Sequence, residues 1–137
     1  MPTLSSTPAA TIDITESLVR KLLEEQQPSL SGMSIQIMES GWDNVMIKAG
    51  EEYALRMPRR DVAESLILHE QRWLPWLAPQ LPLPVPEPIF CGKPTAYYPY
   101  HWSLQNWIEG QAADVAPPSP RESEVLASFL QTLHSIP

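Results

Sequence analysis

The spacing of apolar residues changes from two to three or four near the middle of the chain. Before that point, three short runs at residues 34–39, 45–48 and 53–57 have turn residues between them, which is typical of an antiparallel strand meander. From Asp61 onward the apolar residues recur every third or fourth position, which predicts a helix. Strands followed directly by a helix that can pack on them indicate an α+β fold.

Three helices are predicted along the chain. The first covers about residues 15–26, where leucines recur at helical spacing. The second starts at Asp61, whose side chain can cap a helix, and runs to about Trp73 or Leu74, because Pro75 must kink or end it unless it starts a further turn. The third covers about residues 120–135. Its apolar face consists of Val125, Leu126, Phe129, Leu130 and Leu133.

The segment between the second and third helices starts with a run of alternating prolines at residues 82–88. Such a run stays near polyproline II, so it is predicted to be a stiff connector, with a proline-rich docking ligand as the alternative. Two further strands, at 89–91 and at 97–108 with an interruption at Pro99, bring the sheet to about five strands. Residues 1–11 are predicted to be a flexible tail and residues 111–119 a second loose stretch.

Composition limits the classes of partner and compartment. The 137 residues suffice for one domain, and 16 acidic against 9 basic residues give a net charge of −7, which disfavours nucleic acid as a partner. Cys91 is the single cysteine and makes no metal-ligand spacing with the three histidines, so we expect a reducing, cytoplasmic environment. No segment reaches the roughly 18 consecutive apolar residues of a membrane span, and Met1–Thr11 does not have the pattern of a signal peptide.

A cation lies on the third predicted strand. Ala54 and Arg56 share one face of this strand because side chains alternate, while Tyr53, Leu55 and Met57 share the other face. A flat base could pack over Ala54 with its phosphates drawn to Arg56. The alternative is that Arg56 is a solvent-facing edge residue.

Glu70 strengthens the first interpretation. It lies four residues after Leu66 and three before Trp73, so it falls within the predicted apolar stripe of the second helix. An unpaired carboxylate there would cost several kcal/mol, and the planar guanidinium of Arg56 is a suitable partner. The alternative is that the stripe ends at Leu66 and leaves Glu70 at its solvent edge.

A third group of candidates occupies the first hairpin turn. Its backbone amides and single glycine could approach phosphates, although an ordinary turn would have the same composition. The turn consists of Ser40, Gly41, Trp42, Asp43 and Asn44.

The order of these parts resembles a kinase-like small lobe, and the chain is similar to the N-terminal part of the aminoglycoside and macrolide phosphotransferase family. The resemblance covers about residues 14–137. It is carried by Glu39-Ser40-Gly41-Trp42-Asp43-Asn44, Ala54-Leu55-Arg56-Met57-Pro58-Arg59-Arg60, Glu70-Gln71-Arg72-Trp73-Leu74-Pro75, Leu83-Pro84-Val85-Pro86, Trp107-Ile108-Glu109-Gly110 and residues 126–134. It implies a nucleotide-binding lobe at 12–110, followed at 111–137 by a linker and the first helix of an incomplete, truncated C-terminal helical lobe.

The resemblance also assigns residues. Arg56 stands where a lysine of the family often contacts the α- and β-phosphates, and Glu70 matches the helix glutamate that orients this cation. Residues 40–44 match the loop that covers the nucleotide. Asn106, Trp107 and Ile108 fall at the hinge whose backbone groups bind the base, so the implied cofactor is ATP or GTP.

The catalytic half of the family pattern has no counterpart here. The family uses a histidine-x-aspartate loop with an asparagine five residues beyond, and a later aspartate that holds Mg²⁺. None of His69, His101 and His134 is followed two residues on by aspartate, and no aspartate follows Asp114. We therefore predict no catalytic residue and no metal ligand, so the chain alone would not transfer the γ-phosphate of ATP or GTP to a small-molecule hydroxyl, antibiotics included.

A second hypothesis from a different class is a stand-alone protein-interaction module that uses the acidic surface or the last helix. In the family, the apolar face of that helix would contact parts of the helical lobe. We expect it to fold back onto the small lobe, to pair with another copy of the chain or with the missing lobe, or to be poorly ordered.

Overall fold

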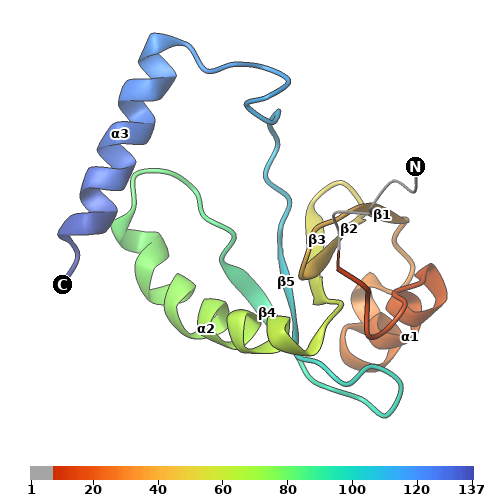
Figure 1. The fold of residues 1–137 in the computed structure, drawn as a ribbon. Coiled ribbons are helices and arrows are strands. Elements are labelled where there is room, and N and C mark those ends of the chain that lie inside the picture. The colour runs from red at the N-terminus through yellow and green to blue at the C-terminus, as the bar shows by residue number, and fades with distance from the viewer. Residues whose placement is uncertain (1–7) are drawn as a thin grey trace, which may run out of the picture.

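The computed structural model of the chain describes residues 8–137, so most of the tail predicted at 1–11 lies outside the described residues. Thr11, the last residue of that tail, donates its backbone N–H to Arg59 O at 2.8 Å. The elements (Figure 1) are α1 Glu16–Gln26, η1 Pro28–Leu30, β1 Ile35–Ser40, β2 Asn44–Ala49, β3 Tyr53–Pro58, α2 Asp61–Leu77, η2 Ala78–Gln80, β4 Pro88–Gly92, β5 Trp102–Asn106 and α3 Pro120–Ser135.

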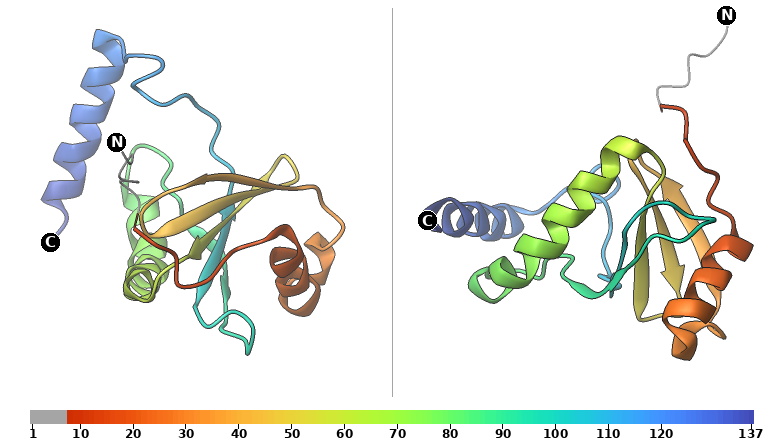
Figure 2. Two further views of the ribbon diagram at one scale, coloured as in Figure 1. Left: turned by 45° about the vertical axis from the view of Figure 1, so that its right-hand side comes forward. Right: turned by 90° about the horizontal axis from the view of Figure 1, so that it is seen from below.

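The five strands form one antiparallel sheet in the order β1-β2-β3-β5-β4. Figure 2 shows α1 and α2 on opposite faces of this sheet. The predicted meander, the later strand pair and the α+β class are therefore confirmed. No helix in the described part of the chain is both long enough and apolar enough to cross a membrane.

The hydrophobic core lies between α1 and one face of the sheet. Ile47, Leu55 and Leu104 are neighbours across β2, β3 and β5, and all three are buried. Trp102 is also fully buried there, and a Cβ added to Gly92 on β4 would overlap its ring, so only glycine fits beside it. Removing this apolar surface from water supplies most of the driving force for folding of the lobe.

α2 packs on the other face, but on a different side of the helix from the one predicted. Its buried residues are Ala63 and Ile67, whereas Leu66 and Trp73 of the predicted stripe, and Val62 one turn before Leu66, are 45%, 47% and 59% exposed. The buried side of α2 is therefore shifted by one residue from the predicted stripe: it contains Ala63 and Ile67 instead of Val62 and Leu66. The small Ala63 allows close approach to the sheet, which the larger residue at 62 would not.

Contacts with the segment before β5 fix the first turn of α2. The Tyr100 hydroxyl donates to Asp61, and burial together with this bond raises the pKa of Tyr100, which keeps it a neutral donor. Glu64 Oε1 lies 2.7 Å from His101 Nδ1 and accepts the His101 backbone N–H at 3.1 Å. The predicted capping role of Asp61 was thus wrong: Asp61 is the first residue of the helix, and Arg60 occupies the N-cap position without a side-chain cap, since a guanidinium has no acceptor.

Two predicted boundaries also differ from the structure. α2 continues through Pro75 to Leu77, since a proline removes one hydrogen bond while Ala78 N–H still donates to Leu74 O beyond it. The strand predicted at 97–108 is limited to β5, because the preceding residues form a loop held by the buried Tyr98, whose hydroxyl donates to Pro58 O at 2.7 Å.

α3 is well formed but stands apart from the sheet (Figure 1). Ser119 and Glu122 make a reciprocal capping box at its start, and none of its residues is buried. The predicted helix is confirmed. Val125, Leu126 and Leu130 of its apolar face are exposed, whereas Phe129 and Leu133 are partly buried.

Candidate functional site

The sheet face on the α2 side differs from the core face in its chemistry. Arg56 on β3 lies between Met46 on β2 and Ser103 on β5, and Ala54 lies between Lys48 and Gln105. Ala54, Ser103 and Gln105 are buried. This face therefore presents a small residue beside a cation, with polar neighbours on both sides.

Arg56 and Glu70 form the ion pair that the sequence predicts. Arg56 Nε lies 3.0 Å from Glu70 Oε2, and the two side chains are 30% and 27% exposed. Glu70 reaches Arg56 because it lies one turn beyond the buried Ile67, on the side of α2 that faces the sheet. The Nε–H is not aimed at the carboxylate well enough for a hydrogen bond, so the contact is held by charge.

The turn at residues 40–44 joins β1 to β2 and closes with a hydrogen bond from Gly41 N–H to Asn44 O at 2.9 Å. Gly41 does not have a positive φ, and a Cβ built on it would meet nothing nearer than Asn44 O at 3.5 Å. The protein itself therefore does not require glycine here. A ligand that approaches the turn backbone closely would require glycine at this position, because a side chain would be in its way.

A hollow of about 540 Å³ opens beside this turn. It is lined by Met38, Ser40, Gly41 and Met46. Met46 is the cross-strand neighbour of Arg56, and Arg56 Nη1 lies 4.0 Å from its sulfur. The hollow, the turn and the Arg56–Glu70 ion pair therefore form one continuous region.

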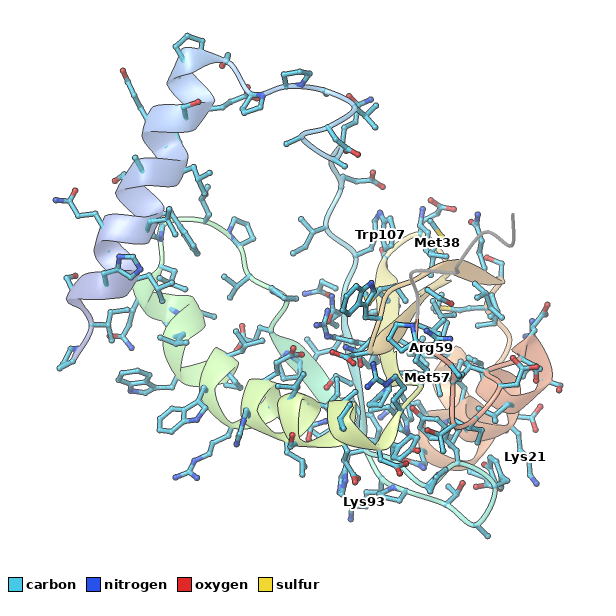
Figure 3. All side chains as sticks on the ribbon, viewed as in Figure 1. Lys21, Met38, Met57, Arg59, Lys93 and Trp107 are labelled. Atoms are coloured by element: carbon cyan, nitrogen blue, oxygen red, sulfur yellow. The ribbon has the colours of Figure 1, made fainter. Side chains whose placement is uncertain are left out.

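The segment after β5 borders the same face. Trp107, labelled in Figure 3, has its ring centroid 5.0 Å from Lys48 Nζ, which also lies 2.9 Å from Glu51 Oε2. Trp107 N–H donates to Glu52 O at 2.8 Å, so this amide of the predicted hinge is already occupied.

Asn106 and Ile108, the other two predicted hinge residues, are exposed. Both line a second cavity of about 220 Å³, together with the segment after α2: Ala78, Pro84, Val85, Glu87 and Ile89. These two hinge residues therefore line the same cavity as residues of the proline-rich connector.

Sequence reasoning missed Lys48 and Gln105 as members of this region. Both lie directly opposite Ala54, on β2 and β5 respectively. The alternation of side chains along a strand assigns each residue to one of two faces, but it does not tell which residue of a neighbouring strand lies opposite Ala54. That depends on the strand register.

No group of three His, Cys, Asp or Glu side chains in residues 8–137 is arranged to hold a metal ion. Glu70 faces Arg56 and Asp43 faces Arg60, so the carboxylates nearest the region are paired with arginines. The region thus combines the partly exposed guanidinium of Arg56 with the buried polar side chains of Ser103 and Gln105.

Comparison with known proteins agrees with this geometry. The sequence profile described as the phosphotransferase enzyme family matches residues 34–137. No curated protein sequence matches the chain closely enough to count as a relative.

Several solved structures share the fold. Wild-type aminoglycoside 2'-phosphotransferase-IIIa in complex with GDP has a TM-score of 0.77 at 21% identity, covering 90% of this chain and 43% of that one. The ternary complex of APH(2")-IIa with streptomycin and ATP has a TM-score of 0.58 at 18% identity, covering 92% and 42%. Macrolide 2'-phosphotransferase type I has a TM-score of 0.53 at 21% identity, covering 92% and 46%. This chain thus spans less than half the length of each of these proteins.

Proposed function

The chain belongs to the phosphotransferase enzyme family, and we propose that its residues 12–110 form a lobe that binds ATP or GTP. The observation that carries this proposal is the Arg56–Glu70 ion pair beside the hollow at the glycine turn. In a kinase-like lobe, a strand cation oriented by a helix carboxylate contacts the nucleotide phosphates. Arg56 is suited to this task because its guanidinium has several donors, so one edge can face Glu70 while another faces a phosphate.

The remaining candidates fit around this anchor. The base would lie over Ala54, near Lys48 and Trp107, and the turn at 40–44 would cover the phosphates. The compared structures include complexes with GDP and with ATP, which supports a nucleotide as the ligand of this lobe. The backbone of Asn106 and Ile108 would bind the base edge, since the Trp107 amide is occupied.

The reaction of the complete enzyme would be transfer of the γ-phosphate to a hydroxyl of a small molecule, as the names of the aminoglycoside and macrolide phosphotransferases indicate for those proteins. Within this chain no histidine is followed two residues later by aspartate, and the described residues offer no metal cluster. We therefore propose that residues 111–137 are a linker and the first helix of a helical lobe. The chain alone would bind the nucleotide without transferring phosphate.

The proposal is tested by calorimetric titration of the purified chain with ATP, GTP and GDP, with and without Mg²⁺. Binding that depends little on Mg²⁺ and is lost in Arg56→Gln supports it. Arg72→Gln is the matched control, because Arg72 is an exposed arginine that lies over the ring of Trp73 on α2 instead of facing Glu70. Binding of no nucleotide would overturn the proposal, and strict dependence on Mg²⁺ would reveal a metal site that the proposal excludes.

The exposed apolar face of α3 favours a second candidate function, a non-enzymatic interaction module. Under that alternative the chain binds no nucleotide, and Arg56→Gln leaves its partner binding unchanged. The same titration therefore separates the two functions.

A further inference from the structure

Arg59 and Arg60 both contact the turn at residues 40–44. Arg59 N–H donates to Asp43 O at 2.8 Å, and Arg59 Nη1 donates to Gly41 O at 3.2 Å. Arg60 Nη1 lies 3.4 Å from Asp43 Oδ1, and both of these side chains are partly buried. Figure 3 labels Arg59 at the end of β3. Two consecutive residues thus hold the turn through three separate contacts.

The same two residues begin the next helix. Arg60 is the N-cap residue of α2, and its carbonyl accepts the N–H of Ala63 at 3.1 Å. α2 carries Glu70, the partner of Arg56. The position of the turn and the position of the phosphate-facing cation are therefore linked through one short, covalently continuous segment.

A turn that projects from a sheet has few packing contacts and opens easily. Here the contacts from Arg59 reach main-chain carbonyls, so they restrict the backbone of the turn, and the Asp43 carboxylate adds a charge-assisted contact on the same side. An ordinary surface ion pair joins two side chains and leaves the backbone free.

We propose that Arg59 and Arg60 are positioning residues that hold the glycine turn over the hollow and couple it to α2. This inference rests on the proposed function, because it assigns the consequence of that coupling to nucleotide binding. Neither residue is required to touch the nucleotide. Their effect is to keep the turn closed before the ligand arrives, which lowers the entropy cost of binding.

The first test uses the nucleotide-free chain and hydrogen exchange of the Gly41 amide, which is protected by its bond to Asn44 O. In Arg59→Gln, which loses the Nη1 bond to Gly41 O, and in Arg60→Gln and Asp43→Asn, we expect this exchange to accelerate by about fivefold, the scale of a partly exposed hydrogen bond or ion pair. Arg60→Lys should restore part of the protection, because it keeps the charge. The matched control is Glu16→Gln, which removes the carboxylate partner of Arg20 on α1 and should leave Gly41 exchange unchanged.

The second test measures nucleotide affinity by calorimetry in the same variants. We expect the dissociation constant to rise by about fivefold in Arg60→Gln and Asp43→Asn, with an equal melting temperature. The double variant should lose no more than either single one, since both act through one contact. Because Asp43→Asn alters the turn and not α2, it keeps the test valid if Arg60→Gln folds poorly.

The two tests separate two kinds of failure. If the unmodified chain binds no nucleotide, the proposed function fails, while Gly41 exchange still decides whether the arginines hold the turn. Unchanged exchange in Arg59→Gln, Arg60→Gln and Asp43→Asn would overturn the positioning role. Faster exchange with unchanged affinity would overturn the coupling to binding.

Discussion

Arg56 Nε on β3 and Glu70 Oε2 on α2 lie 3.0 Å apart, so a charge contact joins the sheet to the helix that covers it. Both side chains remain nearly one-third exposed, and water screens their attraction. An ion pair of this kind contributes only about 1 kcal/mol or less to the free energy of unfolding. Its larger effect is geometric, because it fixes the direction of the Arg56 guanidinium.

This relationship predicts the behaviour of Glu70→Gln. The free energy of unfolding should change by less than about 1 kcal/mol, whereas nucleotide affinity should fall by about tenfold because the guanidinium loses its charged partner. Thermal melting and calorimetric titration measure the two quantities. Glu16→Gln on α1 is the control and should change neither. A loss of stability with no loss of affinity would show that the pair is structural only.

Substitutions at Gly41 distinguish a ligand-facing turn from an ordinary one. The chain has room for a methyl group there, since its nearest contact would be Asn44 O at 3.5 Å. Gly41→Ala and Gly41→Val should therefore melt within a few degrees of the unmodified chain, while nucleotide affinity falls further with the larger side chain. Equal affinity in both variants would mean that no ligand approaches the turn backbone.

A substitution at Gly92 should reduce stability, in contrast to one at Gly41, because another side chain of the protein occupies the space beside Gly92. A Cβ at this position would overlap the ring of Trp102, which is fully buried. Gly92→Ala should reduce the free energy of unfolding by about 2 kcal/mol, the usual cost of overpacking. The control is Gly110→Ala, where a Cβ meets nothing within 4 Å. Denaturant titration of both variants checks the difference, and equal midpoints would contradict this account of the β4–β5 packing.

The elements were predictable because the apolar spacing and turn residues are local signals. α1, the meander and α3 agree with the predicted segments within one or two residues. The rotation of α2 was not predictable, since Val62 and Ala63 offer two adjacent apolar lines and the choice depends on which one fits the sheet. Glu70 faces Arg56 because α2 turns the side that contains Ala63 toward the sheet. The predicted apolar stripe, from which the ion pair was inferred, is not the side that packs.

Other parts of the site depend on contacts between distant segments. The pairing of Lys48 and Gln105 with Ala54 follows from strand register. The contacts of Arg59 and Arg60 with the turn require the β2–β3 hairpin to bring residues 43 and 59 together. Single residues in a sequence carry no signal for either arrangement, whereas a carboxylate and a cation on successive elements do suggest a pair.

The final prediction concerns the uncovered face of α3, on which Leu126 and Leu130 are 51% and 42% exposed and no residue is buried. Apolar surface left in water forfeits roughly 25 cal/mol per Å², so this face favours association with another copy or with a helical lobe. We expect the purified chain to sediment as a concentration-dependent oligomer. Leu126→Ser combined with Leu130→Ser should return it to the monomer without changing nucleotide affinity, because these residues lie outside the Arg56–Glu70 region. A chain that stays monomeric at high concentration while the α3 amides remain protected from exchange would show that this helix is stable without a partner.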